Sequence, residues 1–462
     1  MPRKRTPRAD VVDPGLNARI VAGRLQDLDG VEILCGIPSF NNARTIGNVV
    51  RAVEAGLRRV FPDVPAAIVV SDGGSEDGTP QAALDASTGP DEELLMIDPK
   101  APAPARLVLN YEGISGKGSA FRSIFALAAR TGVRGCAVFD SDLRSITPGW
   151  VENLLKPVLV SGQDFVAPIY ARHKYDGTIT NAIAFPLSAA LYGYRVRQPI
   201  GGEFGFSGKL ASYWSEQDVW ETDVARYGID IWMTTTAIVQ KFRVCQAQLG
   251  AKVHDAKDPG AHLGPMFRQV VTTILRLAVA NEDRWAKVHG SHDVPAYGFE
   301  RLVDPPPLEI NVLRLLTEFH QGALTLGSTW SEMLAPDTVA EVVALAGEAG
   351  TVAEAVQHLV ATQAPAAGQP STAAMAAAAA AFNFPDTLWA RVIYDLVITA
   401  RDQPDRLEAF VTALVPVYFG RVASAVIENR DLSTDRAEDS VERQAREFER
   451  LKPYLVNRWS HS

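Results

Sequence analysis

The stretch Ala137–Trp150, AVFDSDLRSITPGW, is the most informative in the chain, because an apolar run that should be buried ends there in two carboxylates. Asp140 and Asp142 are separated only by Ser141, so no Lys or Arg lies between them. Two such carboxylates repel each other unless something positive lies nearby. A divalent cation with oxygen ligands would remove the repulsion, since residues two apart at a strand end can face one side. The alternative is that Asp142 caps a helix or lies in a solvated turn.

Around this stretch, short apolar runs alternate with amphipathic segments from about residue 31 to residue 166. This alternation is typical of βαβ units that build a parallel sheet, so the predicted fold class is α/β. We expect strands within residues 31–40, 66–72, 106–110, 136–142 and 164–168, and helices at about 45–59, 79–84, 117–129 and 149–160.

Polar residues follow three of the expected strands directly. Ser39-Phe40-Asn41 follows the first, Ser71-Asp72-Gly73-Gly74 the second, and Asp140-Ser141-Asp142 the fourth. Ligands of open α/β sheets bind beyond the carboxyl ends of the strands. The sequence therefore predicts a binding site at this edge of the sheet.

These motifs together resemble the nucleotide-diphospho-sugar transferases of the GT-A fold, broadly the glycosyltransferase family 2 superfamily. In GIPSFNNARTIGNVV (36–50), Pro38, Phe40 and Asn41 match the family pattern, whereas Asn42 replaces its usual Glu. In VVSDGGSEDGT (69–79) the matching residues are Asp72, Ser75, Asp77 and Gly78. The resemblance implies a GT-A (Rossmann-like) domain. Its implied donor nucleotide contacts are Pro38, Phe40, Asn41, Asp72, Gly73, Ser75, Lys117 and Ser141.

Three further segments resemble the retaining enzymes that make glucosyl-3-phosphoglycerate and mannosylglycerate. GISGKGSAFRSI (113–124) is similar to their Gly-Lys-Gly element, which implies that Lys117 approaches the donor, and a flanking Gly favours close approach of the backbone to a ligand. The alternative is a solvated lysine in a first helical turn. The resemblance of YGIDIWMTTTAI (227–238) and PIGGEFGFSG (199–208) implies donor sugar contacts at Gly202, Glu203 and Asp230. Lys117 and Asp230 are the implied catalytic residues.

The metal site that the resemblance implies contains Asp140, Asp142 and a histidine, with Mg²⁺ or Mn²⁺ as the cofactor. The segment LGAKVHDAKDPGAHLGPMFRQV (249–270) resembles the element that supplies this histidine. We prefer His254, because the letters KVH carry the match, and His262 is the rival.

The expected acceptor loop departs from the pattern of the relatives that use phosphoglycerate. Those enzymes carry Gly-Arg-Val-Thr, whereas this chain has Gly177-Thr178-Ile179-Thr180. Thr178 has no charge to meet a dianionic phosphate, which an Arg could bind bidentately. Arg172, Asp176 and Thr180 have a spacing similar to that with which mannosylglycerate synthases hold free glycerate. The expected acceptor residues are therefore Arg172, Asp176, Thr178 and Thr180, although Arg172 and Asp176 could equally form a surface ion pair.

Composition limits the partners and the compartment. A net charge of -9 argues against a general nucleic-acid binder. Cys35, Cys136 and Cys245 are widely spaced, which suggests buried thiols and a reducing cytoplasm without a disulfide framework. We expect no membrane partner, since no run of about 18 apolar residues occurs.

The expected domains are an N-terminal arm (1–28), a GT-A domain (29–300) with donor (29–166) and acceptor (167–300) halves, and a C-terminal helical region (301–462). One apolar stripe of the last expected helix contains Val441, Ala445, Phe448 and Leu451. Such a stripe favours packing within the chain over an interface between chains, and a homodimer is the alternative.

The function that the sequence favours is a retaining, metal-dependent transfer of glucose or mannose from a nucleotide diphosphate sugar to a small hydroxy acid. D-glycerate is the expected acceptor and UDP-glucose or GDP-mannose the donor, giving a glycosylglycerate, a compatible solute. Alternatives are a glucosyl-3-phosphoglycerate synthase, an inverting family 2 enzyme with another acceptor, a nucleotidyltransferase and a non-catalytic sugar-nucleotide sensor. No nucleophilic carboxylate is evident, so we expect a front-face displacement in which the leaving phosphate takes the acceptor proton.

Overall fold

The computed structural model describes residues 12–13, 16–86, 101–253, 259–299, 307–362 and 382–461. The chain divides into two compact units. Unit 1 contains Met1–Ala171, Val196–Ala261 and Asp293–Pro305; unit 2 contains Arg172–Arg195, His262–His292 and Pro306–Ser462. This division differs from the expected boundary near residue 300, because two inner segments group with the C-terminal helices.

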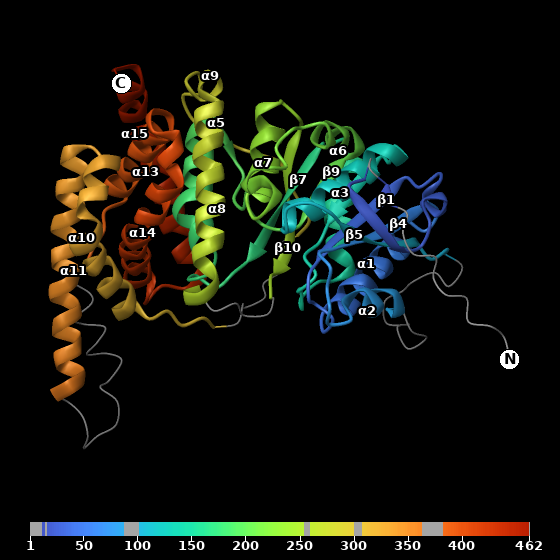
Figure 1. Ribbon diagram of the computed structural model, residues 1–462, viewed down its shortest axis with the longest axis horizontal. Helices are drawn as coiled ribbons and strands as arrows, with labels where there is room; N and C mark the ends of the chain where they lie inside the picture. The colour runs from blue at the N-terminus through green and yellow to red at the C-terminus, as the bar shows by residue number, and fades with distance from the viewer. Residues whose placement is uncertain are drawn as a thin grey trace. The chain divides into compact units, whose positions relative to one another are not determined.

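Unit 1 is built on a ten-stranded sheet with the order β1-β2-β5-β4-β3-β6-β9-β7-β10-β12 (Figure 1). The strands are β1 (Val12–Asp13), β2 (Ala18–Ala22), β3 (Ile33–Ser39), β4 (Ala66–Asp72), β5 (Ala105–Tyr111), β6 (Gly135–Val138), β7 (Phe165–Ala171), β9 (Phe204–Ser207), β10 (Val244–Ala251) and β12 (Ala296–Tyr297). The pairs β3/β4, β3/β6, β4/β5, β7/β10 and β10/β12 are parallel. The predicted α/β fold is therefore confirmed, and all five expected strands are present.

Two features of the sheet were not expected. β9 runs antiparallel between β6 and β7. It therefore begins at the edge of the sheet where the parallel strands end, and the residues just before β9 lie at that edge. β2 pairs antiparallel with β5, so residues 18–22, which were assigned to the N-terminal arm, belong to the sheet.

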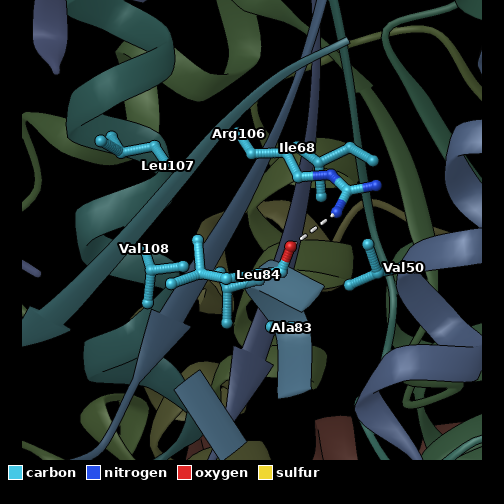
Figure 2. A pocket seen from close by; sticks show the side chains of 8 residues that line it. Val50, Ile68, Ala83, Leu84, Arg106, Leu107 and Val108 are labelled. Atoms are coloured by element: carbon cyan, nitrogen blue, oxygen red, sulfur yellow. Dashed lines mark hydrogen bonds between the residues drawn. The ribbon is translucent and has the colours of Figure 1, made fainter. Parts of the chain in front are cut away.

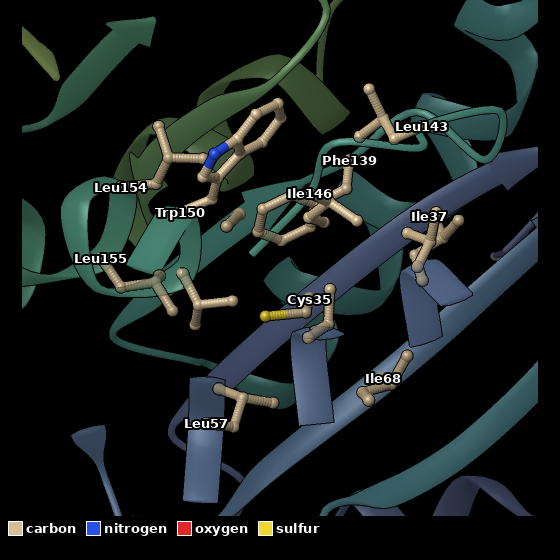
Figure 3. Close-up of a cluster of buried hydrophobic side chains, with 14 of the residues drawn as sticks. Cys35, Ile37, Leu57, Ile68, Phe139, Leu143, Ile146, Trp150, Leu154 and Leu155 are labelled. Atoms are coloured by element: carbon tan, nitrogen blue, oxygen red, sulfur yellow. The ribbon is translucent and has the colours of Figure 1, made fainter. Parts of the chain in front are cut away.

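Every residue of β3 is buried, as is usual for a parallel strand covered on both faces. Alternate side chains of β3 point to opposite faces. Cys35 and Ile37 join a core cluster that includes Leu57 of α1 and Leu154 of α4 (Figure 3). Gly36 faces the other way, and a Cβ there would lie 2.6 Å from Ile124 Cδ1 of α3.

The helices of unit 1 are η1 (Leu25–Leu28), α1 (Ile46–Val60), α2 (Thr79–Asp85), α3 (Lys117–Thr131), α4 (Pro148–Leu159), α6 (Gly208–Ser215), η4 (Asp223–Ala225) and α7 (Ile229–Val239). The four that were predicted, α1 to α4, begin and end close to the expected limits. α3 ends at Gly132, whose left-handed φ of 66° suits a helix C-cap. α4 begins after Thr147 with Pro148 in its first turn, so the helix cap that Asp142 could have formed is not observed.

A small pocket lies among α1, α2 and the strands β4 and β5 (Figure 2). Arg106 Nη1 donates a hydrogen bond to the Leu84 carbonyl at 3.2 Å beside it. The lining residues are Val50, Ile68, Val70, Ala83, Leu84, Arg106, Leu107 and Val108. None of the predicted site residues lines this pocket, so it carries no chemistry of its own.

Unit 2 is almost entirely helical over its described residues. Its elements are a π-helical turn (Thr180–Ala184), α5 (Phe185–Tyr192), β8 (Tyr194–Arg195), α8 (Pro259–Ala280), α9 (Glu282–Trp285), β11 (His292–Asp293), α10 (Val312–Met333), α11 (Pro336–Thr362), α13 (Asp386–Asp402), η5 (Pro404–Arg406), α14 (Leu407–Asn429) and α15 (Thr434–His461). The expected C-terminal helical region is therefore present, and residues 363–381 lie outside the described part.

The helical segment Pro404–Asn429 is long and apolar enough to cross a bilayer by length and composition alone, and 67% of its apolar window is buried inside the structure. The buried face of α14 includes Phe410, Leu414 and Val417. This burial is typical of a core helix.

The stripe on α15 also packs within the unit. Ala445 is fully buried against Phe185 and Ala189 of α5, with Val441 beside them, and Phe448 is also fully buried. The predicted intramolecular packing of these residues is confirmed.

Candidate active site

The loops after β3 and β4 are held together by the Asp72 carboxylate, which is fully buried. Its oxygens accept hydrogen bonds from Ser39 Oγ (2.7 Å), Ser75 Oγ (2.7 Å) and the amides of Gly74 (2.9 Å) and Ser75 (2.7 Å). Four bonds fill the acceptor positions of a carboxylate. Asp72 therefore shapes this loop, and a direct contact between its side chain and a nucleoside would have to replace one of these bonds.

The neighbouring residues present an aromatic ring at the same edge. Phe40 is 56% exposed, whereas Pro38 is buried in β3. Asn41 has a left-handed φ of 54°, and its amide donates to Ser75 Oγ at 2.8 Å. A Cβ at Gly73 would lie 2.8 Å from Tyr111 Oη and 3.1 Å from Phe40 Cδ2, so no larger residue fits between these rings.

Ser141 joins the Asp-Ser-Asp turn to the first loop. Its hydroxyl donates to Asn42 Oδ1 at 2.8 Å, and its carbonyl accepts from Thr45 Oγ1 at 2.7 Å. Asn42 is the residue that replaces the usual Glu of the family pattern, and here it takes part in this connection. The loops after β3, β4 and β6 are thus brought together as predicted.

The positive groups beside Asp140 are two lysines. Lys117 Nζ lies 2.8 Å from Asp140 Oδ1, and Lys252 Nζ lies 3.0 Å from Asp140 Oδ2. Lys117, in the first turn of α3, also lies 3.2 Å from the carboxylate of Asp230, in the first turn of α7. Both lysines are shielded from solvent, with side chains 14% and 6% exposed.

Lys252 is held from behind by a fully buried carboxylate. Its ammonium donates to both oxygens of Glu203 (3.0 and 2.9 Å) and to the Gly201 carbonyl (2.9 Å). Tyr170 of β7 donates its hydroxyl to the same Glu203 carboxylate. Asp140, Glu203, Asp230, Lys117 and Lys252 thus form one array, called the lysine–carboxylate cluster below.

The electrostatics of this cluster separate its carboxylates. Burial alone would raise the pKa of Asp140, but the ammonium groups of Lys117 and Lys252 lower it well below its ordinary value. Burial raises the pKa of Glu203 to about 7, with Lys252 opposing the rise and Asp140 adding to it. Burial likewise raises the pKa of Asp230, against the effect of Lys117. With a pKa of about 7, Glu203 is the carboxyl group of the cluster that titrates near neutral pH.

The glycines near the cluster approach protein groups. A Cβ at Gly118 would lie 1.8 Å from the Val224 carbonyl oxygen, and one at Gly116 would lie 2.6 Å from the Ala225 carbonyl oxygen. These glycines allow α3 to pack on the segment before α7, and the approach of a ligand to their backbone stays a prediction. Gly202, at φ +100°, approaches Asp140 in the same way: a Cβ added at Gly202 would lie 2.5 Å from Asp140 Oδ2.

Glu203 and Lys252 are the residues whose roles differ most from the sequence reading. Glu203 was expected to contact a donor sugar, but its side chain is 0% exposed and faces Lys252 and Tyr170. Lys252 was not assigned a role, although it directly follows β10. A lysine at the carboxyl end of a strand in an α/β sheet was the signal that could have identified it.

The predicted acceptor residues lie in unit 2. Arg172 Nη1 lies 3.1 Å from Asp176 Oδ2, and these side chains are 18% and 33% exposed. Thr178 Oγ1 accepts a hydrogen bond from Tyr418 at 2.5 Å, and Thr180 is 8% exposed at the start of the π-helical turn. The ion pair that the sequence left open is thus present and partly buried, and the acceptor role stays a prediction.

Of the three predicted metal ligands, the structure describes Asp140 and Asp142. Mg²⁺ usually binds through one or two carboxylates and completes its shell with water and substrate phosphates. Asp142 is partly buried two residues beyond Asp140, whereas each Asp140 oxygen already faces an ammonium group. Within the described part of the chain, no three His, Cys, Asp or Glu side chains are grouped to hold a metal. His254 and the side chain of His262 lie outside that part. Because both Asp140 oxygens face ammonium groups, a cation at this turn would need substrate phosphates to complete its shell, and the assignment of Asp140, Asp142 and His254 as its ligands stays a prediction.

No family model matches this chain, and no curated protein sequence matches it significantly. Among solved structures, the chain is similar to glucosyl-3-phosphoglycerate synthase from Mycobacterium tuberculosis. The complex of that enzyme with Mn²⁺, UDP and glucosyl-3-phosphoglycerate is 25% identical with a TM-score of 0.41, over 55% of this chain and 84% of that chain. Its complex with Mg²⁺ and UDP has the same identity and TM-score over 56% and 84%. Its complex with Mn²⁺, UDP-glucose and glycerol 3-phosphate is 25% identical with a TM-score of 0.39, over 56% of this chain and 85% of that chain.

These structures are of one of the kinds of enzyme that the sequence motifs resemble.

Proposed function

We propose that this protein transfers a hexose from a nucleotide diphosphate sugar to a small acceptor of the glycerate type, with a divalent cation as cofactor. The observation that carries the proposal is the lysine–carboxylate cluster next to the Asp-Ser-Asp turn. It gathers cationic and anionic side chains at the carboxyl edge of an α/β sheet, where such folds bind their ligands.

On the donor side, the loops joined by Asp72 and Ser141 would hold the nucleotide, with the exposed ring of Phe40 available to a base. Lys117 would face the diphosphate and exchange part of its pairing with Asp140 for a phosphate oxygen. Ammonium groups that are already in place stabilise negative charge as it develops on a leaving group, and this is usually the largest catalytic contribution.

Asp230 would lie near the reacting sugar, because it is paired with Lys117. Its raised pKa and its ion pair suit orientation and charge stabilisation better than covalent attack. We assign Glu203 and Lys252 to the support of Asp140, since Glu203 is enclosed by protein groups.

A cation held by Asp142, with His254 as the second predicted ligand, would supply Lewis-acid charge to the diphosphate. We expect Asp142→Asn to lose metal-dependent binding of the nucleoside diphosphate, measured by titration calorimetry with and without Mn²⁺. Asp218→Asn is the matched control, because Asp218 is exposed and outside the site. Equal metal dependence in the two variants would contradict the assignment.

For the acceptor we favour D-glycerate, because Thr178 has no charge for a phosphate. One observation keeps 3-phosphoglycerate in the test: Arg172, a side chain that could meet a phosphate, is close enough to the acceptor loop to pair with Asp176. GDP-mannose stays a second candidate donor, since the residues of the loops after β3 and β4 do not indicate whether uracil or guanine is bound.

The test is a product assay that crosses UDP-glucose and GDP-mannose with D-glycerate and 3-phosphoglycerate, in Mg²⁺ or Mn²⁺. Release of the nucleoside diphosphate and the anomeric configuration of the product are followed by NMR. We expect an α-linked glycosylglycerate. Transfer to 3-phosphoglycerate alone would correct the acceptor, and donor hydrolysis without transfer would overturn the acceptor class while keeping the donor site.

A further inference from the structure

The segment that contains the predicted acceptor residues Thr178 and Thr180 has an irregular backbone. Residues 180–184 form a π-helical turn, in which the Phe185 amide donates to the Thr180 carbonyl. In a regular α-helix that amide would donate to Asn181, and the next one would donate to Ala182. The next residue is Pro186, which has no N–H. The carbonyls of Asn181 and Ala182 therefore lose their usual helical donors.

Two side chains from the C-terminal helices supply the missing hydrogen bonds. Trp389 Nε1 of α13 donates to the Ala182 carbonyl at 2.7 Å, and Gln444 Nε2 of α15 donates to the Asn181 carbonyl at 2.7 Å. Both side chains are buried, with their residues 0% and 3% exposed. A buried carbonyl without a partner is costly, so these bonds stabilise the π-helical turn.

A third helix holds the loop before the turn. Tyr418 of α14 donates its hydroxyl to Thr178 Oγ1 at 2.5 Å. Lys174 Nζ donates to the carbonyls of Arg430 (2.6 Å) and Leu432 (2.8 Å), just after the end of α14. Cationic groups are favourable at this end of a helix. The loop is therefore attached to α14 at two points.

We propose that α13, α14 and α15 act as the scaffold that positions the acceptor segment, with Tyr418 as the residue that orients the Thr178 hydroxyl. Because Thr178 Oγ1 accepts from Tyr418, its own O–H is directed elsewhere and can donate to a carboxylate or hydroxyl of the acceptor. A π-helical turn inside a helix is frequent at functional sites, which agrees with this role. The proposal rests on the proposed function only in its choice of Thr178 as an acceptor contact.

The kinetic test compares Tyr418→Phe with Tyr394→Phe. Each variant loses one buried tyrosine hydroxyl from unit 2, but Tyr394 donates to the Phe448 carbonyl and not to the acceptor loop. We expect Tyr418→Phe to raise the KM for the acceptor about five-fold, the size of one net hydrogen bond, with kcat and the donor KM unchanged. Tyr394→Phe should leave all three constants unchanged. Equal acceptor KM values in the two variants would overturn the role of Tyr418.

A double variant shows whether Tyr418 acts through Thr178. Thr178→Val should itself raise the acceptor KM, and Tyr418→Phe added to it should cause no further rise, since coupled residues are not additive. If Thr178→Val leaves the acceptor KM unchanged in an active enzyme, Thr178 is not an acceptor contact and the orienting role fails, while the transferase activity stands.

Hydrogen–deuterium exchange tests the scaffold without any turnover. Amides of residues 177–185 should exchange several-fold faster in Tyr418→Phe and in Trp389→Phe than in Tyr394→Phe. If all three variants exchange alike there, the scaffold proposal is wrong. If the wild-type protein transfers no sugar but the three variants show this exchange pattern, the proposed function is overturned and the scaffold proposal stands.

Discussion

At the scale of single residues, Lys252 decides whether the carboxylates of unit 1 can stay close together. It contacts Asp140 and Glu203, which would otherwise repel each other in a buried environment. Removing one partner of a buried ion pair leaves an uncompensated charge, which is far more costly than the pair is stabilising. The role of Lys252 can therefore be separated into a part for stability and a part for activity.

We expect Lys252→Met to lower the free energy of unfolding by about 3–5 kcal/mol and to abolish sugar transfer. Adding Glu203→Gln should recover much of the stability, because the buried charge is then removed, but not the activity, because Asp140 stays displaced. Urea unfolding and the product assay measure the two effects. Recovery of both in the double variant would mean that Lys252 acts on stability alone.

The raised pKa of Glu203 predicts a pH dependence of stability. Its folded pKa is about 7 and its ordinary value is 4.5. Between these values the folded state binds more protons than the unfolded state, so this group makes stability fall as pH rises, by up to about 1.4 kcal/mol per pH unit. Urea unfolding at several pH values should show wild type losing stability relative to Glu203→Gln from about pH 4.5 to 7, and a constant difference above. A parallel course of both proteins would contradict the shift.

At the scale of elements, the start of α3 is defined by its contact with the segment before α7. The Gly118 amide donates to the Arg226 carbonyl at 3.2 Å, and no Cβ fits at this position. This contact brings the first turns of α3 and α7 together, and with them Lys117 and Asp230. Close packing of two backbones thus sets the geometry of a charged pair.

Gly118→Ala should lower the free energy of unfolding by about 2–3 kcal/mol, because a backbone carbonyl cannot move aside as a side chain can. Gly47→Ala is the matched control. Gly47 is also the second residue of its helix, α1, but a Cβ there would meet the flexible end of the Arg51 side chain at 3.3 Å, and its other neighbours, Ala82 O and Ala86 Cβ, at ordinary contact distances of 3.7 and 3.8 Å. That variant should gain up to about 1 kcal/mol. Thermal unfolding of both proteins checks the opposite signs, and equal signs would refute the contact argument.

At the scale of the whole molecule, the chain forms two compact units that are not continuous in sequence. Residues 172–195 and 262–292 belong with the C-terminal helices. α5 packs on α15 through Phe185 and Ala445, and α13 supplies the partner of the Ala182 carbonyl. The acceptor segment therefore depends on residues that come more than 200 positions later.

A chain that ends at residue 305 tests this organisation. A domain boundary near residue 300 would predict that such a truncation folds normally. We expect instead that it loses the packing of α5 and becomes sensitive to protease within residues 172–195, while the sheet of unit 1 stays protected. Limited proteolysis with mass spectrometry measures the cleavage sites. Protection of residues 172–195 in the truncated chain would show that the C-terminal helices are dispensable for this segment.

Local patterns in the sequence were enough to predict the helices and strands and the edge of the sheet where the candidate site lies. The five predicted strands and the α1 to α4 helices follow from apolar periodicity, which depends on residues that are neighbours in the chain. The polar ends of β3, β4 and β6, with Asp140, were recognisable for the same reason, whereas Lys117 and Asp230 were identified only through the resemblance of their motifs to a known family. Their substrate roles stay predictions.

Which charged side chains meet, and which glycines have a packing role, depends on contacts between residues that are far apart in the chain. Lys252 and Asp140 are 112 positions apart, and Lys117 and Asp230 are 113 apart, so no local pattern relates them. The same holds for Gly118 against Val224, and for Trp389 and Gln444 against the carbonyls of the π-helical turn. The physical reason is that strand order and helix packing set these pairs, whereas periodicity reports only which face of an element is buried.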